Sequence, residues 1–198
     1  MASDPDAALM LAFQGGDASA FRVLFERYGR PMVAFCHHFV RDGARAEELA
    51  QEVFLKLHAS SARYRPTARF KTYLYRIASN HCLNELRRGE YASRRAADPD
   101  ADANGAPLDP DALAGGGASP EESALGAALS REVQALLARL PEKQRAAFVL
   151  ARLEGLPYEE VAEVLQTSVS AVKSLVHRAT VSAAAALAPY LAEREVTP

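Results

Sequence analysis

Four side chains suited to holding a nucleic-acid strand recur along one predicted helix at steps of three, four and seven residues. They are Tyr73, Arg76, Asn80 and Arg87, and with about 3.6 residues per turn they lie in one line on one face. An arginine can pair with a phosphate, an asparagine can hydrogen-bond to base edges, and a tyrosine can stack on an unpaired base. The pattern predicts a strand-binding face, although a basic, water-facing helix with Tyr73 in the core fits it equally well.

The segment that leads into this helix adds positive charge and aromatic rings. Its side chains alternate between the two kinds: Arg63, Tyr64, Arg65, Arg69, Phe70 and Lys71. Residues 63–95 contain nine basic and two acidic side chains, whereas residues 98–122 contain seven acidic side chains and no Lys or Arg. The net charge of −2 therefore hides a strongly basic segment. Because local basic density is what attracts a polyanion, we predict nucleic-acid binding.

A helix predicted over residues 43–59 has an apolar stripe on one side and an acidic face on the other. The stripe consists of Ala46, Leu49, Ala50, Val53 and Leu57. The opposite face carries Glu48, Gln51 and Glu52 around Leu55. An apolar side chain inside a polar rim is typical of a protein-docking ridge. A solvated helix face explains the same pattern, since single exposed leucines are common.

Residues 156–179 have the pattern of a helix-turn-helix. Thr167 and Ser168 supply the turn, and Ser168 can cap the second helix by accepting a backbone N–H. The residues predicted to face inward are Val169, Val172, Val176 and Ala179. Those predicted to face outward are Ser170, Ala171, Ser174, His177 and Arg178, with Lys173 at the flank. Small outward residues allow such a helix to enter a DNA major groove.

The whole chain is predicted to be helical, in two domains. Helices are expected over residues 5–15, 17–39, 43–59, 68–95, 123–139, 141–154, 157–165 and 168–190. Residues 98–122 are rich in Asp, Pro, Gly and Ala and contain no aromatic ring, so they cannot offset the entropy of becoming ordered. We therefore predict an all-α protein with a helical bundle in residues 1–96, a flexible acidic linker over 97–122 and a helix-turn-helix bundle in 123–198.

Local signals mark several helix boundaries. Asp17 is a plausible N-cap of the second helix, and Pro31 is expected to kink or split that helix. Pro141 and Pro157 are expected in the first turn of their helices, where a missing N–H costs nothing.

Several classes of function receive no support from the residues. Cys36 and Cys82 have neither a disulfide-framework nor a metal-ligand spacing, and a buried thiol is the commoner role for Cys36. No apolar run is long enough for a membrane span and the N-terminus lacks secretory-signal features, so we expect a cytoplasmic protein without membrane insertion. No nucleophile–base set or Gly-rich phosphate loop is evident. We expect no enzymatic activity, no cofactor and no metal.

Three segments in order, residues 45–57, 70–88 and 140–179, resemble RNA polymerase sigma factors of the extracytoplasmic-function (ECF) class. The resemblance implies that residues 48–52 grip the clamp helices, a coiled coil of the largest polymerase subunit. It implies that the Tyr73 line and a loop at residues 60–69 recognise and melt the promoter minus-10 element, and that the helix over 168–179 reads the minus-35 element. The linker would run toward the RNA exit path. The implied partners are core RNA polymerase, promoter DNA and an anti-sigma factor whose identity the sequence does not reveal.

The resemblance assigns residues to three sites. The polymerase-binding residues are predicted to be Glu48, Leu49, Gln51, Glu52 and Leu55. The minus-10 residues are predicted to be Arg63, Arg65, Arg69, Lys71, Tyr73, Arg76, Asn80, Arg87 and Arg88. The minus-35 residues are predicted to be Ser170, Ala171, Lys173, Ser174, His177 and Arg178.

Three positions depart from the family pattern. Tyr73 stands where relatives often carry Trp, Arg45 where an acidic residue is usual, and Leu175 where Arg is frequent. Two other classes of function remain open on the residues alone. A helical adaptor that binds only proteins would not need the Tyr73 line. A free-standing repressor using only the helix-turn-helix would usually need to dimerise, and we find no heptad seam.

Overall fold

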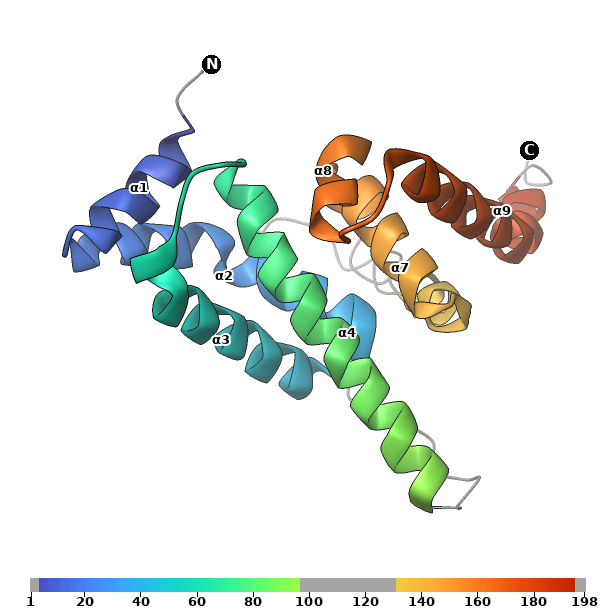
Figure 1. Cartoon of the computed structure of the whole chain (residues 1–198). Coiled ribbons are helices and arrows are strands. Elements are labelled where there is room, and N and C mark those ends of the chain that lie inside the picture. Colours follow the sequence, from blue (N-terminus) through green and yellow to red (C-terminus); the bar gives the residue numbers. More distant parts are fainter. Residues whose placement is uncertain (1–3, 97–130, 195–198) are drawn as a thin grey trace. The chain divides into compact units, whose positions relative to one another are not determined.

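The computed structural model describes residues 4–96 and 131–194, and within these ranges every regular element is a helix (Figure 1). The chain divides into two compact units, residues 1–123 and 124–198, which are described separately below. The prediction of an all-α protein with two helical domains is confirmed. The predicted linker over 97–122 and the start of the helix predicted over 123–139 lie outside the described residues.

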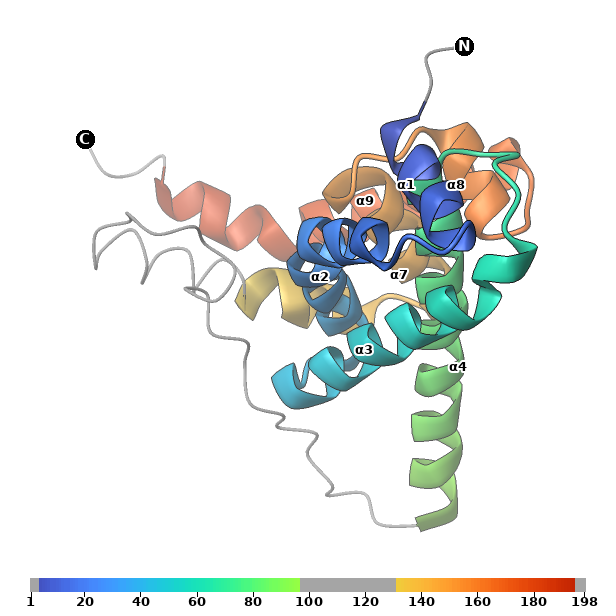
Figure 2. The same ribbon diagram turned by 90° about the vertical axis from the view of Figure 1, so that its left-hand side faces the viewer.

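The first unit contains four α-helices and a short 3₁₀ turn in its described part. They are α1 (Pro5–Gln14), α2 (Ala18–Val40), α3 (Gly43–Ser60), η1 (Ser61–Arg63) and α4 (Phe70–Ala96). The long helix α2 packs against α1, α3 and α4, and Figure 2 shows the same group of helices from the side. Burying apolar surface at these contacts is the main source of stability for such a bundle.

Acidic side chains begin the first three helices. Asp4, Asp17 and Asp42 each accept a hydrogen bond from a backbone N–H in the first turn of α1, α2 and α3, which satisfies a donor that has no partner inside the helix. The prediction for Asp17 is confirmed. Pro31, in contrast, does not split α2, which runs from residue 18 to 40. Buried side chains on both sides of it, Leu24 and Phe35, hold the two halves of the helix in one core.

In the second unit, a helix-turn-helix follows two other helices. Residues 131–139 are helical and are followed by α7 (Glu142–Phe148), the π-helical turn η2 (Val149–Leu153), α8 (Tyr158–Val164) and α9 (Val169–Arg194). Both α7 and α8 pack against α9. The shared core contains Leu137, Val149, Leu150, Val161, Val164, Val172 and Val176.

Pro141 and Pro157 differ slightly from the prediction. Each is the N-cap, with an extended backbone, rather than a residue of the first turn. Their carbonyl groups accept the first helical hydrogen bonds, from the N–H of Arg145 and of Val161 at 2.9 Å each. Because a proline lacks only the donor, its carbonyl can open a helix from the cap position.

Candidate polymerase and promoter surfaces

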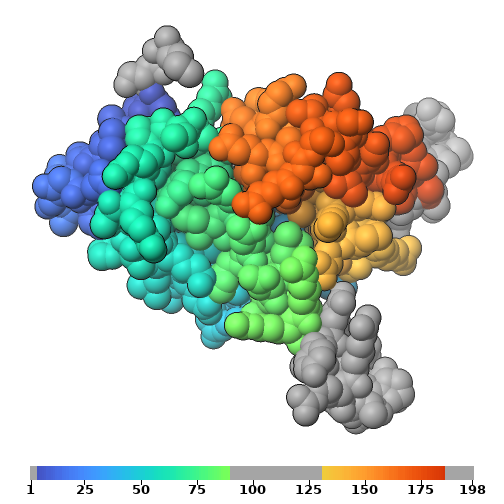
Figure 3. Space-filling view, in the orientation of Figure 1, coloured from blue at the N-terminus to red at the C-terminus, as the bar shows by residue number. Residues whose placement is uncertain are grey.

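Helix α3, which carries the acidic ridge, lies at the surface of the first unit beside α4 (Figure 3). Glu48 and Gln51 are exposed, and the side chain of Leu55 is 69% exposed. The predicted inner stripe, from Ala46 to Leu57, is buried as expected. Leu49, also predicted as a docking residue, is part of that stripe and has no exposed surface, so the structure places it in the core and not on the outward face. Leu49 packs beneath the ridge. Because successive side chains point in different directions around a helix, Leu49 faces the core while its neighbour Glu48 faces solvent.

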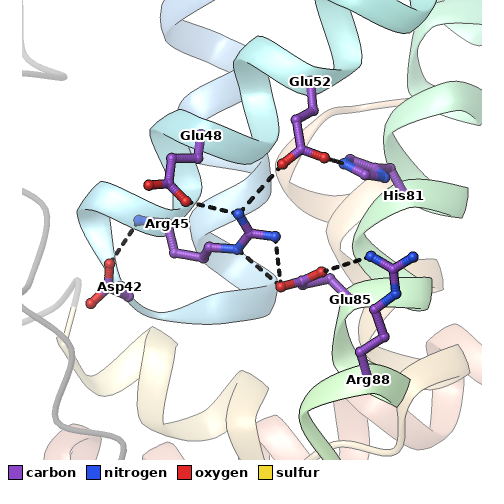
Figure 4. A network of polar contacts seen from close by, with 7 residues as sticks. All are labelled: Asp42, Arg45, Glu48, Glu52, His81, Glu85 and Arg88. Carbon is purple, nitrogen blue, oxygen red and sulfur yellow. Dashed lines mark hydrogen bonds and ion pairs between the residues drawn. The ribbon is translucent and has the colours of Figure 1, made fainter.

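Arg45 joins the ridge to α4 through a network of ion pairs (Figure 4). Its guanidinium donates to Glu85 of α4 from Nε at 2.9 Å and from Nη2 at 2.7 Å. Nη1 donates to Glu48 at 2.8 Å and to Glu52 at 3.4 Å. The hydrogen bond with Glu48, followed by that with Glu85, raises the pKa of Arg45 above its ordinary value. This departure from the family pattern therefore has a structural role: one cation holds three carboxylates on two helices.

Glu52 is turned toward α4 by this network. One of its carboxylate oxygens accepts from Arg45, and the other lies 2.6 Å from Nε2 of His81, whose side chain is nearly buried. The outward part of the ridge is therefore made of Glu48, Gln51 and Leu55. The two α4 partners, His81 and Glu85, were not identified from the sequence, because 29 and 40 residues separate them from Glu52 and Arg45.

The line of side chains on α4 begins with a fixed aromatic pair. Tyr73 is neither fully exposed nor in the core. Its hydroxyl donates to Oγ of Ser60 at 2.9 Å, and its ring meets the buried ring of Tyr64 edge-on, with centroids 5.0 Å apart. The guanidinium of Arg76 lies 5.4 Å from the Tyr73 ring centroid, within the range of a cation–π contact. Both side chains are thus held in place before any ligand binds.

The rest of the predicted minus-10 set is mostly exposed. Asn80 and Arg87 continue the line on α4 in exposed positions. The other exposed members are Arg63, Arg65, Arg69 and Arg88. Lys71 is partly buried, with its ammonium 5.5 Å from the centroid of the Tyr75 ring. The first unit therefore presents a basic face on α4 and the loop before it, next to the acidic ridge on α3.

The helix-turn-helix of the second unit has the predicted inner and outer faces. Oγ of Ser168 accepts from the N–H of Ala171 at 3.1 Å, which confirms the predicted cap. Val172, Val176 and Ala179 are buried, whereas Val169 is only partly so. The exposed outer residues are Ser170, Lys173, Ser174, His177 and Arg178. Ala171 and Leu175 are partly buried at the edge of this face.

The turn between α8 and α9 contains a strained residue. Gln166 has a φ of +51°, in a Schellman motif closed by bonds from the N–H of Gln166 to Glu163 O and of Thr167 to Ala162 O. The same motif ends α1, where Gly16 occupies the equivalent position. In this left-handed region a residue with a Cβ is less favourable by about 1–2 kcal/mol of conformational free energy, whereas glycine is not.

Replacing Gln166 by glycine is therefore expected to stabilise the second unit, by about 0.5–1 kcal/mol after the entropy that glycine adds to the unfolded chain. Urea unfolding followed by circular dichroism measures this change. Glu163→Gly, on an exposed helical position of α8, is the control and is expected to lower stability by about 1 kcal/mol. A lower free energy of unfolding for Gln166→Gly would contradict the prediction.

The two cysteines are neighbours in the core of the first unit. Both thiols are buried, and Sγ of Cys82 donates to Sγ of Cys36 at 3.7 Å. The hydrogen bond with Cys36, together with burial, raises the pKa of the Cys82 thiol. This confirms Cys36 as a buried thiol. In the described parts of the chain, no three His, Cys, Asp or Glu side chains converge as metal ligands.

Among the helices that the structure describes, none combines the length and the apolar character that crossing a bilayer requires.

Comparison with known families identifies both units. The profile of Sigma-70 region 2 matches residues 24–90, and that of Sigma-70 region 4 matches residues 130–180. The chain is 34% identical to the RNA polymerase sigma-H factor of Pseudomonas aeruginosa over 195 residues, 98% of this chain and 99% of the relative. It is 32% identical to the ECF RNA polymerase sigma-E factor of Escherichia coli K12 over 175 residues, 88% of this chain and 90% of the relative.

Solved structures share the fold. CnrH, in complex with the cytosolic domain of CnrY, has a TM-score of 0.68 at 23% identity, covering 94% of this chain and 99% of CnrH. The sigma factor RpoE in complex with the anti-sigma factor NepR, from Bartonella quintana, has a TM-score of 0.62 at 20% identity, covering 84% and 96%.

A region 2 unit followed by a region 4 unit defines a sigma factor, the subunit that gives RNA polymerase its promoter specificity. The chain belongs to the ECF class of sigma factors, and it directs promoter-specific initiation of transcription by RNA polymerase.

Proposed function

We propose that the ridge of α3 binds the clamp helices of core RNA polymerase. Glu48, Gln51 and Leu55 provide an exposed apolar side chain with a polar, negatively charged rim, the composition expected of a docking surface. The network of Arg45 holds Glu48 in place, so that less side-chain freedom is lost on binding.

The basic face on α4 and the 60–69 loop captures the unpaired minus-10 strand. Unstacking a base costs about a few kcal/mol, and stacking it on a protein aromatic ring returns about 1–3 kcal/mol. Contacts made only with the opened strand shift the melting equilibrium toward opening. The fixed pair of Tyr73 and Arg76, followed by exposed Asn80 and Arg87, supports this role.

The second unit reads the minus-35 element through the N-terminal half of α9. Its outer face offers hydroxyls, a histidine and two cations: Ser170, Lys173, Ser174, His177 and Arg178. Partly buried Ala171 adds no bulk that would keep the helix out of a major groove. The domains at 1–96 and 123–198 are joined by the linker at 97–122. When one domain binds promoter DNA, the linker therefore raises the effective concentration of the other domain at that DNA.

The proposal rests on the separation of charge within the first unit, with an acidic ridge on α3 and a basic, aromatic face on α4. An adaptor that binds only proteins has no use for the second face, and a repressor that uses only the helix-turn-helix needs neither. The chain then acts in the cytoplasm with the polymerase, by binding and without covalent chemistry, cofactor or metal. The structures of CnrH and RpoE were solved with bound protein partners. We propose that an anti-sigma factor likewise binds this chain.

Run-off transcription on genomic fragments, with purified core polymerase and the full chain, tests this function. We expect discrete products that require both components, with start sites that share two sequence elements. Products that appear at the same sites with core polymerase alone, or binding to the polymerase without any choice of start site, would contradict it.

A further inference from the structure

The 60–69 loop, whose first residues are the last residue of α3 and the turn η1, is held at its beginning by a side chain from α1. The two N–H groups of Gln14 Nε2 are shared among three carbonyl oxygens, those of Ser61 at 2.8 Å, Ala62 at 3.1 Å and Tyr64 at 3.3 Å. These carbonyls belong to η1 and the residue after it, where the chain leaves α3. One amide therefore sets the path of the chain on both sides of Arg63 and directly before Arg65.

The end of the same loop is held by the residue before α1. Oδ2 of Asp4 accepts from the N–H of Phe70, the first residue of α4, at 2.7 Å. Oδ1 of the same carboxylate accepts from the N–H of Asp6 at 3.0 Å. One side chain thus caps two helices, α1 and α4, and such a cap is a charge-assisted hydrogen bond.

α1 is itself anchored, so the two contacts have a rigid base. The carboxylate of Asp6 pairs with Arg27 of α2 and accepts from the hydroxyl of Tyr28 at 2.6 Å. Met10, a residue of α1, is fully buried in the core. Figures 1 and 2 both show the loop between α3 and α4 running beside this helix, which contacts η1 and α4.

The position of Tyr73 on α4 also depends on the loop, through its contact with the ring of Tyr64. Tyr64 lies in the sequence between Ser61 and Phe70, and its buried ring meets the rings of both Phe70, at 6.4 Å between centroids, and Tyr73, at 5.0 Å. Burial, with the charge of Asp4, raises the pKa of Tyr64 to about 12, so the ring stays neutral. A shift of the loop would displace Tyr64 and with it the edge against which Tyr73 rests.

We infer that α1 is a brace for promoter-strand capture, in which Gln14 and Asp4 position the 60–69 loop from its two ends. Both are positioning residues: they act on the strand through Arg63, Arg65 and Tyr73. The inference rests on the strand-capture role proposed above. It assigns a function to residues 4–14, which precede the segment matched by the region 2 profile.

Gln14→Met tests the brace, because methionine keeps the length and helix propensity of glutamine but cannot donate. Ala12→Met, at an exposed position of α1, is the matched control. The assay uses holoenzyme and a 2-aminopurine-labelled minus-10 single strand from the strongest run-off promoter. We expect Gln14→Met to bind this strand about tenfold more weakly, equivalent to about 1.4 kcal/mol, while assembly with core polymerase stays within about twofold of wild type and Ala12→Met behaves as wild type.

Asp4→Ala tests the other end of the loop and is expected to act in the same direction, so the inference remains testable if Gln14→Met does not fold. Hydrogen exchange of residues 61–70 should rise in both variants, while that of α3 stays unchanged. Unchanged strand binding in both variants, or equal loss of strand binding and polymerase assembly, would overturn the brace. The double variant Arg76→Ala with Asn80→Ala, in the same assay, separates the two proposals. If this double variant binds the strand normally, the strand-capture proposal is wrong. If it binds the strand weakly but both α1 variants bind it normally, only the brace is wrong.

Discussion

Replacing both Arg76 and Asn80 by alanine is expected to abolish promoter opening while leaving the polymerase bound. Asn80 is exposed and can be reached by the opened strand, and Arg76 is already held over the ring of Tyr73. Contacts with an opened strand contribute about 1–3 kcal/mol each. Losing both should lower the population of open complex by at least about 30-fold, which permanganate footprinting of unpaired thymines measures.

Two comparisons show whether the defect lies in opening. A template with a premelted minus-10 region should restore much of the transcription, because the cost of unpairing is then already met. Arg22→Ala, which removes an exposed cation from α2, should open the promoter as wild type does. If polymerase binding falls as far as opening does, the proposed division between α3 and α4 is wrong.

Glu48→Lys combined with Gln51→Ala is expected to release the polymerase. Reversing a charge in a docking surface costs about 2–4 kcal/mol, so the affinity for core polymerase should fall about 30- to 1,000-fold. Both side chains are exposed, and the lost contact between Glu48 and Arg45 is a partly exposed pair on one helix, which contributes less than about 1 kcal/mol. The fold should therefore survive the change. Co-purification and titration of labelled chain with core polymerase measure the effect.

Glu26→Lys is the matched control for this variant. Glu26 is an exposed residue of α2 that pairs with Arg22 one turn away at 3.8 Å, so the control reverses the same charge and breaks a similar pair away from the ridge. It should bind the polymerase normally. Unchanged co-purification of Glu48→Lys with Gln51→Ala, at normal thermal stability, would remove the ridge from the proposed polymerase interface.

Arg45 illustrates why a family pattern can change at one position without loss of the surface around it. Arg45 stands where members of the family usually have an acidic residue, and it pairs with Glu85 on α4. The same cation restrains Glu48 and Glu52. Because the network joins the ridge of α3 to the helix that carries Asn80, the two proposed surfaces of the first unit share one rigid support.

The sequence determined the helices, their faces and the class of protein. Helical periodicity places Ala46, Leu49 and Leu57 in the core, and local caps begin helices at Asp17 and Ser168. These features depend on residues at most a few positions apart, so they can be predicted from the order of residues alone. The assignment to sigma factors followed from three motifs in a fixed order.

Only the tertiary structure decided which distant side chains meet. The pairs of Arg45 with Glu85, Gln14 with Ser61 and Asp4 with Phe70 join residues 40, 47 and 66 positions apart. Tyr73 was equally compatible with core and surface until Ser60 and Tyr64 proved to be its neighbours. Such contacts depend on the angle and rotation at which packed helices cross, and the periodicity of one helix holds no information about its neighbour's position.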